Sequence, residues 1–161
     1  MVNIVLHQPE IPANTGNIAR TCAATGSALH LIRPLGFDIS EKAVRRAGLD
    51  YWNMVNVTVY DDLDDFFKKT GAADIWLTSS KGMLNYAETR YKAGCYLFFG
   101  KETYGLPDAF REAHRDRCLR LPMLSDARCL NLSNAVAVVC YEALRQMGFP
   151  NLVEAGEMAG E

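Results

Sequence analysis

The chain has no long hydrophobic run, no cysteine-rich pattern and no excess of basic charge. Its apolar runs are far shorter than the roughly 20 residues that cross a bilayer, so no membrane partner is expected. The N-terminus lacks the basic region and cleavage site of a signal peptide, which predicts a cytoplasmic protein. The five cysteines form no C-x-x-C or Cys/His pattern, so neither a disulfide framework nor a metal site is predicted.

The common motifs of nucleotide-binding and hydrolytic enzymes are also missing. No G-x-G-x-x-G follows the first apolar run, and no G-x-x-x-x-G-K-[ST], G-x-S-x-G or H-E-x-x-H occurs. These absences disfavour a P-loop kinase and an ordinary dinucleotide enzyme. A net charge of −2 argues against a protein that coats nucleic acid, although a local basic patch is still allowed.

What the sequence does contain is an alternation of apolar runs with helical patterns. Strands are predicted at residues 2–6, 28–32, 55–60, 75–79, 95–99 and 118–121. Helices are predicted at 15–25, 40–47 and 63–69, and another after Pro107. This order predicts one α/β domain over residues 1–152, with a mainly parallel sheet covered by helices on both faces. Residues 153–161 are expected to form a flexible tail.

The segment from Leu119 to Arg145 joins a strand-like start, a polar loop and an apolar helix. Asn131 or Ser133 is expected to cap this helix. Residues 135–140 are apolar on every side, which predicts a helix buried between layers. Gly148 and Pro150 are expected to end it.

Ligands of a parallel sheet bind outside the carboxyl ends of the strands, so the loops after the apolar runs are the candidate site. Four loops qualify, namely 14–20, 78–82, 100–107 and 121–131. Taken singly, the loop at 14–20 is as typical of an ordinary capped helix entrance as of a binding loop. The loop at 100–107 is likewise as typical of a tight strand-to-helix turn as of a binding loop.

Taken together, these segments resemble the motifs of the SPOUT class of RNA methyltransferases. The class carries N-x-G-N-x-x-R, F-G-x-E-x-x-G-L and L-x-L-P…N-L-S-N-A, which match Asn14 to Arg20, Phe99 to Leu106 and Leu119 to Ala135. The resemblance covers nearly the whole chain and includes Arg-Arg-Ala-Gly-Leu-Asp-Tyr at 45–51. With no added RNA-binding domain, the chain is most similar to the small tRNA (cytidine/uridine-2′-O)-methyltransferases of this class, which act on the anticodon wobble nucleotide of leucine tRNAs.

The resemblance implies a SPOUT fold with a C-terminal deep trefoil knot, S-adenosyl-L-methionine as cofactor, and a homodimer. In that dimer the arginine of the first motif reaches toward the cofactor of the partner. The implied cofactor-binding residues are Thr78, Gly100, Lys101, Glu102, Gly105, Leu121, Met123, Cys129, Leu130 and Asn131. Thr78, Leu121 and Cys129 stand where relatives carry leucine, isoleucine and serine, which matters only if the side chains make the contacts.

Arg20 corresponds to the functional arginine of the class and, with Asn17, is the expected catalytic pair. A guanidinium carries only donors, so Arg20 is expected to clamp a phosphate and steer the 2′-hydroxyl. A water or the substrate phosphate would then accept the proton. The expected substrate contacts are Asn14, Arg45, Arg46, Lys81, Arg128 and Tyr141.

Several alternatives stay open. The basic residues among these contacts could be solvated charges, Tyr141 could pack in the dimer, and Ser133 with Asn134 could brace the loop or simply cap the helix. The same chemistry could act on another tRNA or rRNA site. A catalytically silent RNA-binding module of the same fold is the rival from a different class.

Overall fold

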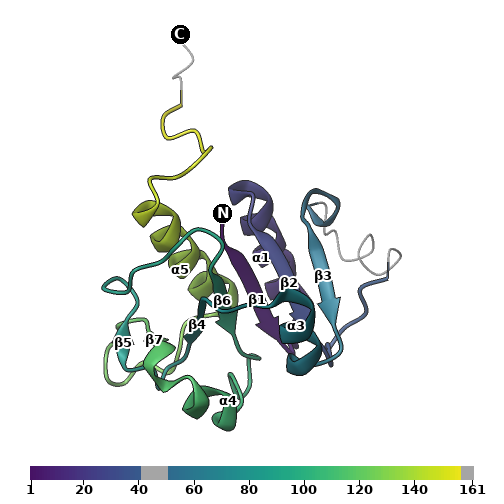
Figure 1. The fold of residues 1–161 in the computed structure, drawn as a ribbon, viewed down its shortest axis with the longest axis vertical. Coiled ribbons are helices and arrows are strands. Elements are labelled where there is room, and N and C mark those ends of the chain that lie inside the picture. The colour runs from purple at the N-terminus through teal and green to yellow at the C-terminus, as the bar shows by residue number, and fades with distance from the viewer. Residues whose placement is uncertain (41–50, 157–161) are drawn as a thin grey trace.

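A computed structural model describes residues 1–40 and 51–156, in which a seven-stranded sheet runs through the molecule (Figure 1). The strands are β1 (Asn3–His7), β2 (Ala28–Ile32), β3 (Val57–Tyr60), β4 (Ile75–Thr78), β5 (Leu84–Asn85), β6 (Tyr96–Phe99) and β7 (Cys118–Arg120). Their order is β3-β2-β1-β6-β4-β7-β5, and every paired neighbour is parallel. The predicted parallel sheet is therefore confirmed. Only β5 was not predicted, because two residues are too short to show a pattern.

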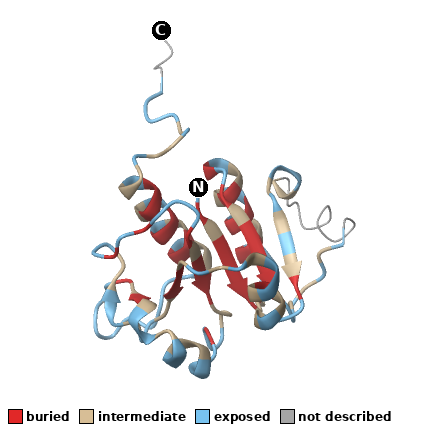
Figure 2. Ribbon diagram, in the orientation of Figure 1, coloured by how far each residue is buried: buried red, intermediate tan, exposed pale blue. Residues whose placement is uncertain are grey.

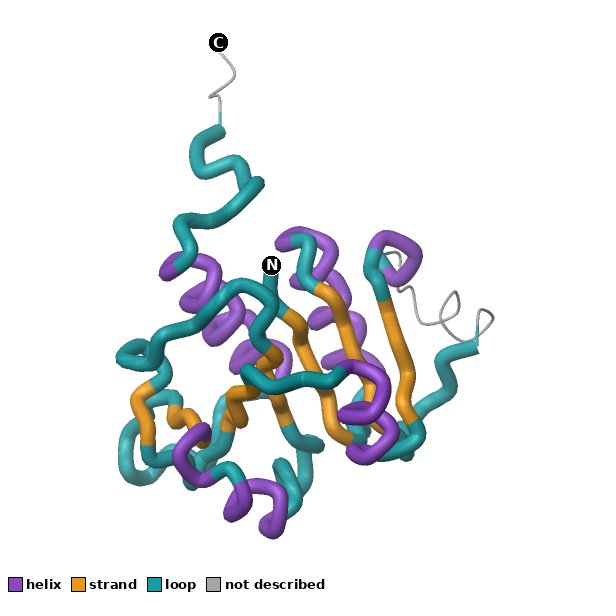
Figure 3. Tube along the Cα trace, viewed as in Figure 1, coloured by secondary structure: helices purple, strands orange, loops and turns teal. Residues whose placement is uncertain are grey.

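Helices cover both faces of this sheet, as predicted (Figures 1 and 3). They are α1 (Pro12–Thr25), α3 (Leu63–Thr70), α4 (Asp108–Ala113) and α5 (Leu132–Gln146), with short 3₁₀ turns η1 (Trp52–Met54) and η2 (Arg115–Arg117). The helices α1 and α5 pack on one face, whereas α3 and α4 lie over the other. The helix predicted at 40–47 lies, apart from Ser40, outside the described residues. No helix in the described ranges has the length and apolar character to span a bilayer.

The central strands are buried on both sides (Figure 2). Successive side chains of a strand point to opposite faces of the sheet, so each strand contributes to two cores. Ile4 and Leu6 of β1 enter the core shared with α1 and α5, while Val5 between them enters the other core. That second core includes several aromatic rings, and the ring centroids of Phe66 and Phe98 lie 5.3 Å apart in an edge-to-face contact. The sheet is thus held from both sides, which leaves its carboxyl edge free to carry loops.

Local capping explains where two of the helices begin. The side chain of Asp62 accepts a hydrogen bond from the amide of Asp65 at 2.7 Å, which starts α3. The side chain of Asn131 accepts from the amide of Ser133 at 2.9 Å, so the prediction that Asn131 or Ser133 caps α5 is confirmed for Asn131. Gly148 follows α5 with a left-handed φ of 72°.

The prediction that the start of α5 is buried on every side is wrong for this chain by itself. Val138 is 39% exposed and Tyr141 is 45% exposed. Only the opposite side of the helix, which includes Val136 and Val139, packs against α1 and the sheet. A face with apolar side chains on α5 therefore remains open to solvent.

The segments after β4 and around β7 are in close backbone contact. The amide of Ser79 donates to the carbonyl of Leu119 at 3.0 Å, and the amide of Met83 donates to Cys118 at 3.1 Å. A Cβ atom on Gly82 would collide with the carbonyl group of Leu119, so a glycine is needed there. The C-terminal trefoil knot stays a prediction.

His30 is a buried polar residue within the sheet. Its Nδ1 lies 2.9 Å from the hydroxyl of Tyr60, and its Nε2 lies 3.3 Å from Oδ1 of Asn3. Burial lowers the pKa of His30 to about 4. Burial and the nearby Lys101 ammonium also lower the pKa of His7.

These shifts predict that acid destabilises the fold. The unfolded state binds protons at histidine near pH 6.5 whereas folded His30 does not until about pH 4, so stability falls as the pH drops through that window. The loss from His30 is about 3 kcal/mol. Urea unfolding between pH 7 and pH 4 should show a shallower pH slope for His30→Gln than for the parent protein. The remaining slope comes from His7 and from carboxylates whose pKa is lowered by hydrogen bonds, such as Asp65 and Glu142. Equal slopes would contradict this account.

Candidate functional site

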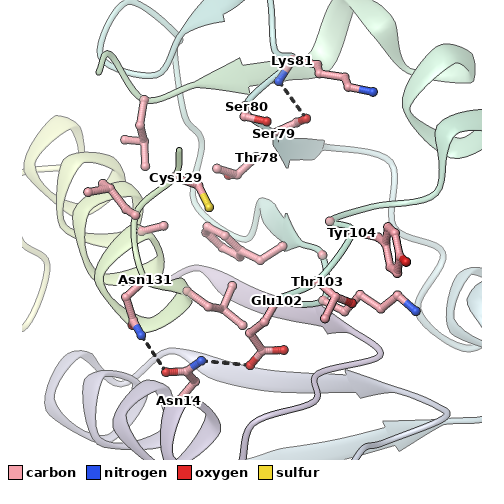
Figure 4. Close-up of a pocket in the computed structure, with 18 of the residues that line it drawn as sticks. Asn14, Thr78, Ser79, Ser80, Lys81, Glu102, Thr103, Tyr104, Cys129 and Asn131 are labelled. Atoms are coloured by element: carbon pink, nitrogen blue, oxygen red, sulfur yellow. Dashed lines mark hydrogen bonds between the residues drawn. The ribbon is translucent and has the colours of Figure 1, made fainter. Parts of the chain in front are cut away.

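A cavity of about 550 Å³ lies at the carboxyl ends of β4, β6 and β7 (Figure 4). It is lined by residues of the loops that follow these strands and by residues at the starts of α1 and α5. Its volume is in the range of small-molecule sites in proteins. The structure therefore forms a cavity at the sheet edge from which the candidate loops were selected.

Every residue that the resemblance implies for cofactor binding lines this cavity. The set comprises Thr78, Gly100, Lys101, Glu102, Gly105, Leu121, Met123, Cys129, Leu130 and Asn131. Their cofactor contacts stay a prediction. The cavity is also lined by residues that were not predicted from the sequence. They are Thr103, Tyr104 and Leu132, from the same loops and helix start, and Arg111 from α4. Arg111 carried no signal in the sequence because α4 contributes to the cavity only through the fold.

The loop from Gly100 to Gly105 is a tight turn that needs glycine at both ends. The amide of Gly105 donates to the carbonyl of Lys101 at 2.8 Å, and Gly105 has a left-handed φ of 72°. A Cβ atom on Gly100 would collide with the backbone of Gly105. This turn brings the side chains of residues 101–104 to the rim of the cavity.

Glu102 links this turn to the beginning of α1. One carboxylate oxygen accepts from the amide of Glu10 at 2.8 Å, and the other accepts from the amide of Ile11 at 3.2 Å. The second oxygen also accepts from the side-chain amide of Asn14 at 3.0 Å. The side-chain amide of Asn131 in turn donates to Oδ1 of Asn14 at 2.9 Å, so one chain of hydrogen bonds joins all three motifs (Figure 4).

This arrangement makes Glu102 a positioning residue. Its carboxylate is used to hold the start of α1, where unpaired amides and the helix dipole both favour an anion. In return, the carboxylate of Glu10 accepts from the amide of Thr103 at 3.1 Å and from its hydroxyl at 2.8 Å. The two segments therefore hold each other by reciprocal carboxylate contacts.

The expected catalytic pair lies elsewhere on α1. Arg20 and Asn17 are both exposed, and neither is among the described residues that line the cavity. The guanidinium carbon of Arg20 lies 4.8 Å from the centre of the Tyr51 ring, a cation–π distance. One chain does not bring Arg20 to its own cavity.

Of the expected substrate contacts, some line the cavity and others lie on the exposed surface. Asn14 and Lys81 line the cavity, with Asn14 buried and Lys81 exposed. Arg128 is exposed in the loop before α5, and Tyr141 lies on the exposed face of α5. Arg45 and Arg46 lie outside the described residues.

The chain is similar to known proteins over almost its full length. A sequence model of the SpoU rRNA Methylase family matches residues 1–141. A protein of Saccharophagus degradans named tRNA (cytidine(34)-2′-O)-methyltransferase is 50% identical over 150 residues, which are 92% of this chain and 97% of that protein. The protein of the same name from Escherichia coli strain K12 is 47% identical over 154 residues, covering 95% of this chain and 98% of that one.

Solved structures show the same similarity. A structure described as giving insights into the 2-OH methylation of C/U34 on tRNA superimposes with a TM-score of 0.85 at 45% identity. The match covers 92% of this chain and 97% of that chain.

The Glu102 contacts predict the effect of replacing its carboxylate with an amide. In Glu102→Gln, one acceptor becomes an NH₂ group that faces N–H donors, so we expect a loss of about 1–3 kcal/mol in unfolding free energy. Calorimetry should also show weaker cofactor binding, because the loop at 100–105 would then be attached to α1 mainly through Thr103 and Glu10. The matched control is Glu112→Gln, at an exposed glutamate of α4. Equal stability of the two variants would contradict the positioning role.

Proposed function

Because the chain belongs to the SpoU rRNA methylase family, and is therefore a methyltransferase, we propose that it methylates the ribose 2′-hydroxyl of the wobble pyrimidine in a tRNA anticodon. The observation that carries this proposal is the near-full-length similarity to proteins named for methylation of cytidine 34. The finer proposal is that the substrates are leucine tRNAs, as the SPOUT resemblance implies. The methyl donor is S-adenosyl-L-methionine.

The cavity suits this cofactor in size and in chemistry. Its floor includes Phe99 and Leu121, which are buried and offer an apolar surface to a flat ring. The hydroxyl oxygen of Thr78 is buried at the cavity and has no hydrogen-bond partner among the described residues, whereas buried polar atoms normally have one. A ligand with polar edges would supply that partner, so the residues present fit the group.

The protein's task in this reaction is placement. S-adenosyl-L-methionine supplies an activated methyl group when bound, so the remaining requirement is a ribose hydroxyl aligned with it. Thr78 and the loops at 100–105 and 121–131 would hold the cofactor. Asn131 and Asn14 would keep these loops in register with α1 through their hydrogen bond.

We assign Arg20 and Asn17 to the tRNA side of the reaction. Arg20 would clamp a phosphate through two parallel donors, and Asn17 would orient the hydroxyl. Since both lie outside the cavity of their own chain, this role requires a homodimer in which Arg20 serves the partner's cavity. The exposed face of α5, with Val138 and Tyr141, supports such pairing.

Further features of the proposal follow from the family. Lys81, Arg128 and the arginines at 45 and 46 would contact tRNA phosphates, and Tyr141 would contact tRNA or the partner chain. Residues 1–152 would form the knotted methyltransferase domain, and the tail expected at 153–161 lies, from residue 157 on, outside the described residues. A tRNA substrate also favours a cytoplasmic location.

Methylation of undermethylated tRNA tests the activity directly. The protein is incubated with methyl-labelled S-adenosyl-L-methionine and total tRNA lacking ribose methylation, and the labelled nucleotide is mapped. We expect label on the 2′-oxygen of nucleotide 34 of leucine tRNAs. Label on a base, or no label at all, would contradict the proposal.

The role of Arg20 is tested by the substitution Arg20→Lys, which keeps the charge and removes the bidentate fork. Losing one charge-assisted hydrogen bond should lower kcat/KM for tRNA by about 10- to 100-fold. The affinity for cofactor, measured by calorimetry without tRNA, should not change, because the proposed role of Arg20 is to hold a tRNA phosphate. Arg90→Lys, at another exposed arginine, is the control. Full activity of Arg20→Lys would exclude the clamp.

A further inference from the structure

Tyr104 is an unusual feature of the cavity rim. It lines the cavity and yet is 85% exposed, at the tip of the turn from Lys101 to Gly105 (Figure 4). A single exposed aromatic ring on a protein surface needs no special explanation. Two further observations separate Tyr104 from such a residue.

The first observation is that the backbone on both sides of Tyr104 is fixed. The amide of Gly105 bonds the carbonyl of Lys101 at 2.8 Å and closes the turn. Thr103 is attached through its amide and its hydroxyl to the carboxylate of Glu10. The ring is therefore carried on an ordered support, and a ligand that uses it need not order the loop first.

The second observation is the charge beside the ring. The ammonium of Lys101 lies 5.4 Å from the ring centre of Tyr104, and Lys81 lies on the same cavity. An aromatic face next to a cation is the combination that proteins use for single-stranded nucleic acid, where bases stack and phosphates pair with the charge. The other side chains of the turn, those of Lys101, Glu102 and Thr103, are polar, so the ring is carried by a polar loop.

We propose that Tyr104, with Lys101 beside it, forms a subsite for an unstacked RNA base next to the methylated nucleotide. The inference rests on the proposed function and extends it, because it names a contact for a neighbouring nucleotide. Bases in RNA loops are commonly splayed out and stacked on aromatic side chains. Because the ring lies on the cavity proposed to hold the methyl donor, a nucleotide flanking the methylated ribose would lie near it.

Two substitutions separate stacking from other roles of the side chain. Tyr104→Leu removes the aromatic face, and Tyr104→Phe keeps it while removing the hydroxyl. Val153→Ser is the control, since Val153 is 91% exposed and lies after α5, away from the cavity. The measurements are the Kd for an anticodon stem-loop RNA by fluorescence anisotropy, kcat and KM with tRNA, and the Kd for cofactor by calorimetry.

We expect Tyr104→Leu to raise the RNA Kd and the tRNA KM by about tenfold, within the range of one lost stacking contact. Its kcat and cofactor Kd should match those of the parent protein, and Tyr104→Phe and Val153→Ser should stay within about twofold of it in every measurement. Unchanged RNA affinity in Tyr104→Leu would overturn the subsite. So would a change in sedimentation without a change in RNA affinity, because the ring would then pack against another copy of the chain. A parent protein that binds the stem-loop but methylates nothing would refute the proposed function, while the RNA affinities would still decide the subsite.

Discussion

The cavity depends on the hydrogen bonds that the carboxylate of Glu102 accepts. This carboxylate accepts hydrogen bonds from two backbone amides at the start of α1 and from the side chain of Asn14. The N-cap side chain of α1, that of Ile11, makes no capping hydrogen bond. The carboxylate of Glu102, from a distant loop, accepts hydrogen bonds from the backbone there instead. The loop after β6, the start of α1 and, through Asn14, the start of α5 are thereby fixed relative to one another.

The parallel sheet explains why these segments can meet. All of its paired strands run in the same direction, so the loops that follow β4, β6 and β7 emerge at one edge. Cores on both faces keep the strands in place, and the close contact of Gly82 with Leu119 brings two of these loops together. The chain has a net charge of −2, yet two lysines, Lys81 and Lys101, are among the residues that line the cavity.

Both α1 and α5 carry some side chains that lie at the cavity or in the core and others that lie on the surface. Asn14 points into the network at the cavity, whereas Arg20, on the same helix, rests on the ring of Tyr51. On α5 the buried Val136 and Val139 contrast with the exposed Val138 and Tyr141. The described residues of a single chain thus form the cavity, but the expected catalytic arginine, Arg20, lies outside it, and this supports the proposed dimer.

The amino-acid sequence alone predicts the alternation of strands and helices, the cap at Asn131 and the loops around the cavity. These features follow from hydrophobic periodicity and from capping chemistry, which act over a few residues. Tertiary structure alone decided the contact of Glu10 with Thr103, the exposure of one face of α5 and the position of Arg20 outside the cavity. Glu10 and Thr103 are 93 residues apart in the chain, and neither has a local pattern that indicates a partner. Their contact exists only because a parallel sheet brings the ends of β1 and β6 side by side.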